Sequence, residues 1–189
     1  MSENPVSSDQ NIIDQTQCWV KNVIVGHNFC PFAKRELDRG SVRYSVNHSN
    51  DMEPALQAMI DECGYLDDND DTETTLLIFT EGFKDFENYL DLVELGEKLI
   101  ADQDYEGIYQ FASFHPDYCF AGAEQDDAAN YTNRSPYPML HLIREASMEQ
   151  AIKHHPDAEA IPERNIEYAR ELGLGEMKRQ LDVCRKSND

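Results

Sequence analysis

The stretch TTLLIFT, from Thr74 to Thr80, decides the fold. It is almost wholly apolar, and a run of this kind predicts a strand with both faces of its sheet covered. A strand buried in this way needs helices packed above and below it. Helices and further strands are therefore expected on both sides of this stretch.

Helical periodicity flanks the stretch on both sides. Apolar residues recur every three or four positions in residues 51–66 and again in 85–101, which predicts a helix in each. Further strands are predicted at 42–47, 107–115 and 138–144. This alternation predicts an α/β fold, a single-domain layered sandwich with helices packed on the faces of a mixed, mostly parallel sheet of about four strands.

The two ends of the chain are predicted to contain helices and no strands. Residues 1–10 predict a disordered tail, and 11–25 predict a helix that Gly26 ends in a left-handed cap. Further helices are predicted to open at Ser147, Pro162 and Gly175. We therefore expect one domain over residues 11–175 and an exposed helical extension over 176–189.

Charge excludes two classes of partner. The 189 residues include 16 basic and 37 acidic side chains, which gives a formal net charge of −21. Such a surface repels phosphate backbones and anionic lipid heads, so we expect neither a nucleic acid nor a membrane as partner. The first ten residues lack the pattern of a secretory signal, and five cysteines without a C-x-x-C suit a reducing compartment. We expect a soluble, acidic, cytoplasmic protein.

One connection is too long for a compact domain. Residues 116–137 show no clear secondary structure, and loops of this length are usually functional or disordered. Several aromatic side chains lie in it, and a disordered linker would hold few. We interpret it as an ordered functional loop. Residues 130–144 contain no Asp or Glu, and we expect a ligand or a partner to bind there.

Four residues of this loop are candidates for substrate binding: Asn130, Asn133, Arg134 and Tyr137. An arginine offers a forked set of donors that matches a carboxylate or a phosphate. The alternative is that Arg134 and Asn133 cap the loop's own backbone carbonyls and bind nothing.

Three residues are candidates for catalysis. His115 lies at the carboxyl end of the predicted strand 107–115, where α/β sheets place their ligand crevices. His141 lies on the next predicted strand, either as a partner of His115 or as a satisfied core residue. Cys30 precedes Pro31 at a predicted helix start, which would lower its thiol pKa and make it a nucleophile, unless it is an inert buried thiol.

No cofactor and no metal site is predicted. Cys119, combined with the histidine and cysteine candidates above, has zinc-binding residue types but not a zinc-binding spacing. The acidic residues 67–73 lack the glycine and the final glutamate of a calcium loop. The common nucleotide-binding and hydrolase motifs are also absent from the sequence.

Several segments together resemble a known family. They are Trp19, residues 25–33 (VGHNFCPFA), 74–77 (TTLL), 113–116 (SFHP) and 130–142 (NYTNRSPYPMLHL). The chain resembles, over roughly residues 15–173, a bacterial family of unknown function, domain of unknown function 1415. The resemblance implies a cytoplasmic bacterial protein and supplies no activity. His27 stands where the family motif has another residue, so we do not expect it to be catalytic.

A second resemblance gives an alternative fold. The order of Cys30-Pro31-Phe32-Ala33 before a strand, a helix and a strand is similar to glutaredoxin-type thiol proteins. Those proteins need a strand directly before the cysteine, whereas residues 11–25 have helical periodicity. A thioredoxin-like fold is therefore the alternative to the layered sandwich.

Three functions follow from these candidates. The first is an enzyme that acts on a small polar or anionic metabolite through the loop of residues 115–141. The second is a non-catalytic module that binds a ligand or a protein. The third is a thiol-redox or metal-binding protein centred on Cys30 and His115. The sequence leaves open whether the protein is an enzyme at all, and it does not give the oligomeric state.

Overall fold

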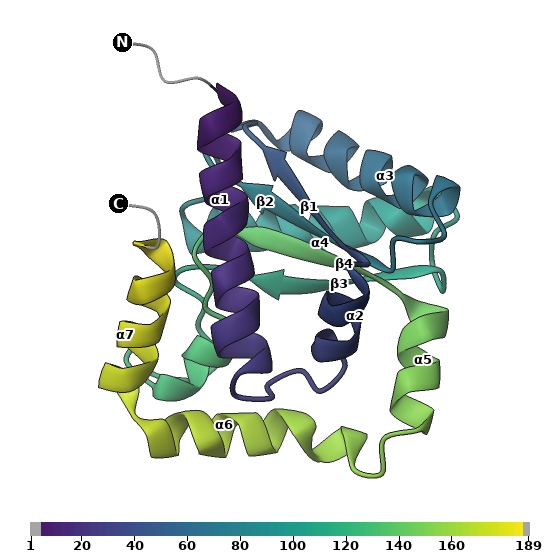
Figure 1. Ribbon diagram of the computed structural model, residues 1–189. Helices are drawn as coiled ribbons and strands as arrows, with labels where there is room; N and C mark the ends of the chain where they lie inside the picture. The colour runs from purple at the N-terminus through teal and green to yellow at the C-terminus, as the bar shows by residue number, and fades with distance from the viewer. Residues whose placement is uncertain (1–4, 187–189) are drawn as a thin grey trace. The chain divides into compact units, whose positions relative to one another are not determined.

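The computed structural model describes residues 5–186, and the order of its elements follows the prediction (Figure 1). The strands are β1 (Val42–Asn47), β2 (Thr74–Phe79), β3 (Tyr109–Phe114) and β4 (Met139–Arg144). The helices are α1 (Pro5–Trp19), η1 (Val20–Val25), α2 (Ala33–Arg39), α3 (Met52–Asp68), α4 (Phe86–Asp102), η2 (Ala128–Thr132), α5 (Glu145–Lys153), η3 (Ala158–Ala160), α6 (Ile161–Leu172) and α7 (Leu174–Arg185).

The chain divides into two compact units. One contains residues up to 34, 115–136 and from 157 onward, and we call it the helical unit. The other contains residues 35–114 and 137–156, and we call it the sheet unit. Residues 1–4 of the predicted tail and 187–189 of the predicted extension lie outside the described residues. The described part of α1 begins at Pro5, inside the stretch expected to be a tail.

The sheet unit confirms the predicted α/β class. Its four strands lie in the order β1-β2-β4-β3. The pair β1 and β2 is parallel, as a strand-helix-strand crossover through α3 requires, while β4 is antiparallel to both of its neighbours. The sheet is mixed as expected, but its balance is mostly antiparallel rather than mostly parallel. The reason is that the chain returns after the long loop in the opposite direction and inserts β4 between β2 and β3.

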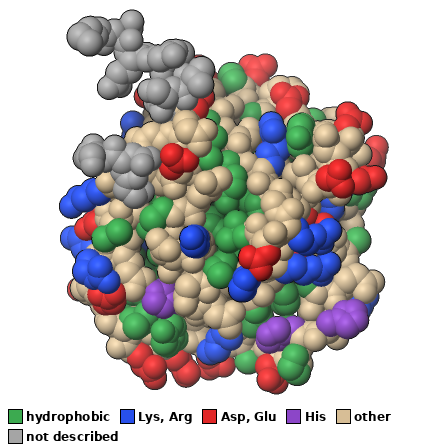
Figure 2. Space-filling view, in the orientation of Figure 1, with side chains coloured by type: hydrophobic (Ala, Val, Ile, Leu, Met, Phe, Trp, Pro, Cys, Tyr) green, Lys and Arg blue, Asp and Glu red, His purple; other side chains and the backbone are tan. Residues whose placement is uncertain are grey.

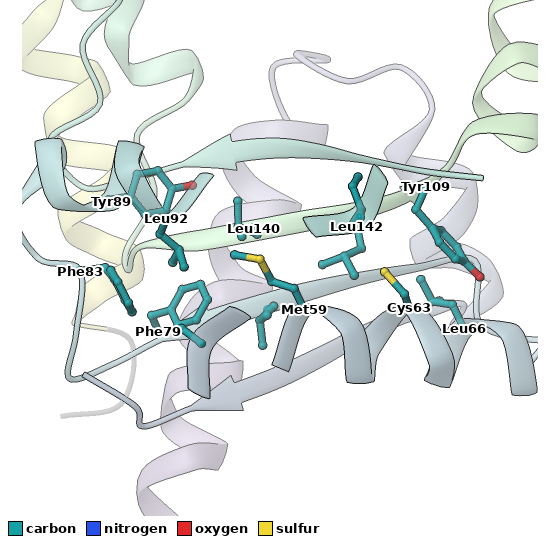
Figure 3. Close-up of a cluster of buried hydrophobic side chains, with 13 residues drawn as sticks. Met59, Cys63, Leu66, Phe79, Phe83, Tyr89, Leu92, Tyr109, Leu140 and Leu142 are labelled. Carbon is teal, nitrogen blue, oxygen red and sulfur yellow. The ribbon is translucent and has the colours of Figure 1, made fainter. Parts of the chain in front are cut away.

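Helices α3 and α4 cover one face of this sheet. Figure 3 shows Met59, Cys63 and Leu66 of α3 pointing toward the strand residues Leu140 and Leu142, all of them buried. Burial of each large apolar side chain contributes roughly 1.5–3 kcal/mol, so this layer supplies much of the stability of the unit. All six residues of β2 are buried, as the opening stretch predicts.

An arginine ties the end of α3 to the last strand. The Arg144 guanidinium donates hydrogen bonds to the backbone oxygens of Leu66, at 2.5 Å, and Thr72, at 3.2 Å. The last carbonyls of a helix have no partner within the helix, and a cation there also offsets the negative end of the helix dipole. Arg144 therefore acts as the cap of α3.

The first helix ends in an unusual way. After Trp19 the backbone continues as the π-helix η1, in which Gly26 N–H donates to the Lys21 oxygen at 3.0 Å. The expected left-handed conformation at Gly26 is wrong, because its φ is −58°. Glycine is needed for another reason: a Cβ there would lie 2.2 Å from the Asn22 carbonyl oxygen. The left-handed residue is Asn28, with a φ of 55°.

The last helix packs inside the helical unit. Met177, Leu181 and Cys184 of α7 are buried, and α7 lies against α1 and α6. The extension expected from residue 176 therefore corresponds to a helix with a buried apolar side. No strand precedes Cys30 within residues 5–186, since η1 occupies that place, so the structure does not support the thioredoxin-like alternative. In the same part of the chain, no helix is long and apolar enough to cross a membrane.

Candidate functional site

The long loop between β3 and β4 is ordered, as expected. All five residues of η2 are buried, and the helix starts with a cap in which the Asp127 side chain accepts from Ala129 N–H. The same carboxylate forms an ion pair with Arg170 of α6 at 2.6 Å. Helix α6 packs along η2, so the middle of the loop belongs to the packed interior of the helical unit.

Asn130 holds two turns of the loop together. Its side chain is fully buried, and Oδ1 accepts from Phe120 N–H at 3.0 Å. Its Nδ2 donates to the Glu124 carbonyl oxygen at 2.9 Å. A buried amide whose donor and acceptor are both used for backbone groups stabilises the loop.

Arg134 is committed to the same loop. Its Nε donates to the Tyr118 oxygen at 3.0 Å, and its Nη2 donates to the Gln125 oxygen at 2.9 Å. The guanidinium also lies over the Tyr131 ring, 4.7 Å from the ring centroid. These contacts are those of the alternative in which Arg134 caps the loop's own carbonyls. Asn133 accepts a hydrogen bond at Oδ1 from the Thr132 hydroxyl at 3.1 Å.

His115 has the most constrained position of the predicted catalytic residues. The residue is fully buried. Its backbone N–H donates to the backbone oxygen of Asn133 at 3.3 Å, and its backbone oxygen accepts from the backbone N–H of Tyr118 at 3.1 Å. Its ring nitrogen Nδ1 accepts a hydrogen bond from Asp117 N–H at 3.0 Å. An Nδ1 that accepts cannot carry a proton, so a neutral His115 carries its proton on Nε2.

Cys30 lies in the turn between η1 and α2. Burial raises the pKa of its thiol, an effect that outweighs hydrogen bonds from the backbone of Phe32 and Ala33. Helix α2 begins three residues later than the cysteine, at Ala33. These surroundings favour the neutral thiol over the thiolate that a nucleophile requires.

Two residues of α6 hold this turn in place. Asn165 Nδ2 donates to the Phe29 oxygen at 2.7 Å, and Arg164 Nη2 donates to the Asn28 oxygen at 2.5 Å. Sequence reasoning did not single out either residue. They lie more than 130 positions beyond the turn, and nothing in the local sequence indicates such a long-range contact.

His141 and Tyr137 belong to the sheet unit. His141 lies on β4 between Leu76 of β2 and Ala112 of β3, and its ring centroid is 6.4 Å from that of Phe114. Burial lowers the pKa of His141 to about 4, so the imidazole is neutral at pH 7. Tyr137 is partly buried and stands two positions before β4. Backbone hydrogen bonds within the loop thus join His115 to Asn133 and Arg134 to Asn130.

The sheet unit contains a hollow that sequence reasoning missed. Its volume is about 350 Å³, and its walls include three carboxylates, Glu97, Glu106 and Glu145, together with Tyr109 and Phe111. The carboxylates come from three separate segments, so no sequence pattern links them. None of the predicted site residues lines this hollow.

Acidic side chains are frequent on the surface of the protein. On the face drawn in Figure 2, acidic side chains lie in many places and basic side chains lie among them, as expected of a solvating coat. Among residues 5–186, no group of three or more His, Cys, Asp or Glu side chains is arranged to hold a metal ion.

Comparison with known proteins gives a family and no activity. Neither a curated protein nor a solved structure matches the chain. One family model does match, that of a protein of unknown function (DUF1415), and the match covers residues 11–179. It includes the loop of residues 115–136 and the turn that holds Cys30. The chain therefore belongs to the DUF1415 family.

Proposed function

We propose that this protein is an enzyme that acts on a small polar or anionic metabolite, with His115 as its central catalytic residue. The observation that carries the proposal is the hydrogen bond from Asp117 N–H to His115 Nδ1 at 3.0 Å. It fixes one tautomer of a buried imidazole, and the two further backbone bonds of His115 fix the position of the residue.

The fixed tautomer decides which chemistry His115 offers. Because Nδ1 accepts from the backbone, the proton of the neutral ring is held on Nε2. A neutral imidazole with a fixed N–H polarises a substrate carbonyl and stabilises negative charge that develops on its oxygen. The proposed role is therefore that of a hydrogen-bond donor or general acid, and not that of a base or nucleophile.

The loop residues take a supporting role in this proposal. Asn130 and Arg134 bind the backbone around His115 and keep the loop in one conformation. Rigid support of this kind is what a preorganised donor requires. Asn133, whose backbone oxygen accepts from His115 N–H, is the predicted substrate-binding residue joined directly to it. Roles for Cys30, His141 and Tyr137 remain predictions.

A panel of small carboxylates, phosphate esters and neutral polar metabolites tests the proposal. Ligand-induced shifts of the melting temperature are measured for the wild type, His115→Asn and His115→Gln. Glutamine can place an amide N–H near the position of Nε2, so H115Q should keep part of any shift that H115N loses. His154→Gln, at an exposed histidine, is the matched control and should respond as the wild type does.

Turnover of each hit then separates an enzyme from a binding module. A ligand that binds through His115 and is not consumed would favour the non-catalytic alternative. Hits that bind H115N as tightly as the wild type would contradict a site at His115. If a hit binds the folded Arg134→Ala variant more weakly than the wild type, Arg134 contacts the substrate.

A further inference from the structure

Two cysteines from opposite ends of the chain meet in the helical unit. Cys18 lies in α1 and Cys184 lies in α7, 166 positions later. Their sulfur atoms are 2.6 Å apart, with the Cys18 thiol donating to the Cys184 sulfur. A disulfide bond is about 2.05 Å long, so the contact is only about half an ångström longer than the covalent bond. The packing of α1 against α7 therefore places the two sulfur atoms close to bonding distance.

The two thiols differ in their surroundings. Cys184 is 1% exposed, whereas Cys18 is partly exposed. Asn22, one turn further along from Cys18, donates through Nδ2 to the Cys18 sulfur at 3.3 Å. The attacking species in disulfide exchange is a thiolate that the reagent can reach. Burial and the neighbouring Cys18 raise the pKa of Cys184 to about 12. Cys18 is thus the thiol that meets a reagent first, and Cys184 is the thiol that follows.

We propose that Cys18 and Cys184 form a reversible disulfide between α1 and α7 when the protein meets a small-molecule disulfide. The Cys18 thiolate attacks one sulfur of the reagent, whose S–S bond breaks and releases one thiolate, which is protonated. Cys184 then loses its proton and attacks the Cys18 sulfur of the mixed disulfide, and the second reagent thiol leaves. One reagent disulfide is reduced to two thiols, and the two protein thiols are oxidised to one disulfide.

The other cysteines lie in different environments. Cys63 is buried in the layer between α3 and the sheet. The Cys119 thiol donates to the Ala123 carbonyl oxygen at 3.5 Å. In a reducing compartment the Cys18–Cys184 pair stays as two thiols, so the proposal agrees with the cysteine pattern of the sequence. It does not depend on the role of His115.

The test uses the full chain treated with oxidised glutathione, after which free thiols are alkylated and the intact mass and linked peptides are determined. Three of the five cysteines should remain free, and the linked peptide should join Cys18 to Cys184. Dithiothreitol should restore all five thiols. The oxidised protein should melt several degrees higher, because the bond closes a loop of most of the chain.

Single variants separate the two roles. Cys184→Ser should accumulate a glutathione adduct on Cys18, whereas Cys18→Ser should leave Cys184 unmodified, and Cys30→Ser should behave as the wild type does. Five free thiols after treatment of the folded wild type would overturn the proposal, and so would a disulfide that maps to other cysteines. The wild-type peptide map decides the outcome even if a variant fails to fold.

Discussion

The backbone N–H of Asp117 donates a hydrogen bond to Nδ1 of His115 over 3.0 Å. This bond predicts a single neutral tautomer, with the proton on Nε2. Nitrogen-15 NMR of the imidazole at neutral pH should show an unprotonated Nδ1 and a protonated Nε2. Exposed His154 serves as the reference. A His115 ring with its proton on Nδ1 would contradict both the geometry and the proposed catalytic role.

Replacement of Arg134 should loosen the loop. Arg134→Ala removes the donors to the Tyr118 and Gln125 oxygens. A hydrogen bond that involves a charged group contributes roughly 1.5–3 kcal/mol to stability. We expect a loss of about 2 kcal/mol in the free energy of unfolding, measured with urea. Arg35→Ala, at a side chain that is 72% exposed, should change stability by less than about 0.5 kcal/mol. Equal effects of the two variants would show that Arg134 does not hold the loop.

Two glycine-to-alanine variants should act in opposite directions. In Gly26→Ala the new Cβ would meet the Asn22 carbonyl oxygen at 2.2 Å, so the turn after η1 must shift at a cost of about 1–3 kcal/mol. In Gly64→Ala, within α3, nothing lies within 4 Å of the new Cβ, and alanine should stabilise the helix by up to about 1 kcal/mol. Melting temperatures of the two variants give the comparison. A harmless G26A would mean that the turn has room which the structure does not show.

Acid should weaken the fold through His141. Its pKa is lowered to about 4 in the folded protein, against 6.5 for an ordinary histidine side chain. Between these values the unfolded chain binds a proton that the folded chain does not, so stability falls as the pH falls from about 6.5 to about 4. The contribution is below about 4 kcal/mol.

A leucine variant isolates this contribution. Unfolding of the wild type and of His141→Leu should be followed at several pH values, and the difference between them should change within that window. His154→Gln, at an exposed histidine, is the control variant. Parallel stability curves for the wild type and H141L would show that His141 does not titrate with a lowered pKa.

Hydrophobic periodicity was enough to predict the strands and most helices. β1 occupies the predicted residues 42–47, and β2 ends one residue short of the predicted 74–80. Each depends on a local pattern of side chains, which the sequence contains in full. The direction of β4 is different, because it depends on how the chain returns after the long loop. Nothing in residues 138–144 indicates whether β4 runs parallel or antiparallel to its neighbouring strands.

The candidate site was predicted less completely, for a related reason. The importance and order of the loop follow from its length and aromatic content, which are local properties. The partners of Arg134 are backbone oxygens 9 and 16 positions away. Every residue has a backbone carbonyl, so the sequence does not indicate which carbonyls Arg134 binds. The pairing of Cys18 with Cys184 depends on the packing of α1 against α7. Contacts of this kind become visible only once the fold is known.

The central place of β4 also affects how the protein folds as it is made. β3 pairs with β4 and not with β2, so at the ribosome β3 emerges before its hydrogen-bonding neighbour exists. The intervening loop must close before the sheet is complete. Closure of a long loop loses conformational entropy before the strand contacts that offset this loss can form. Until residue 144 has been synthesised, one edge of β2 and the backbone of β3 are open to pairing with other chains. The ordered loop thus determines how long the nascent sheet is exposed to aggregation.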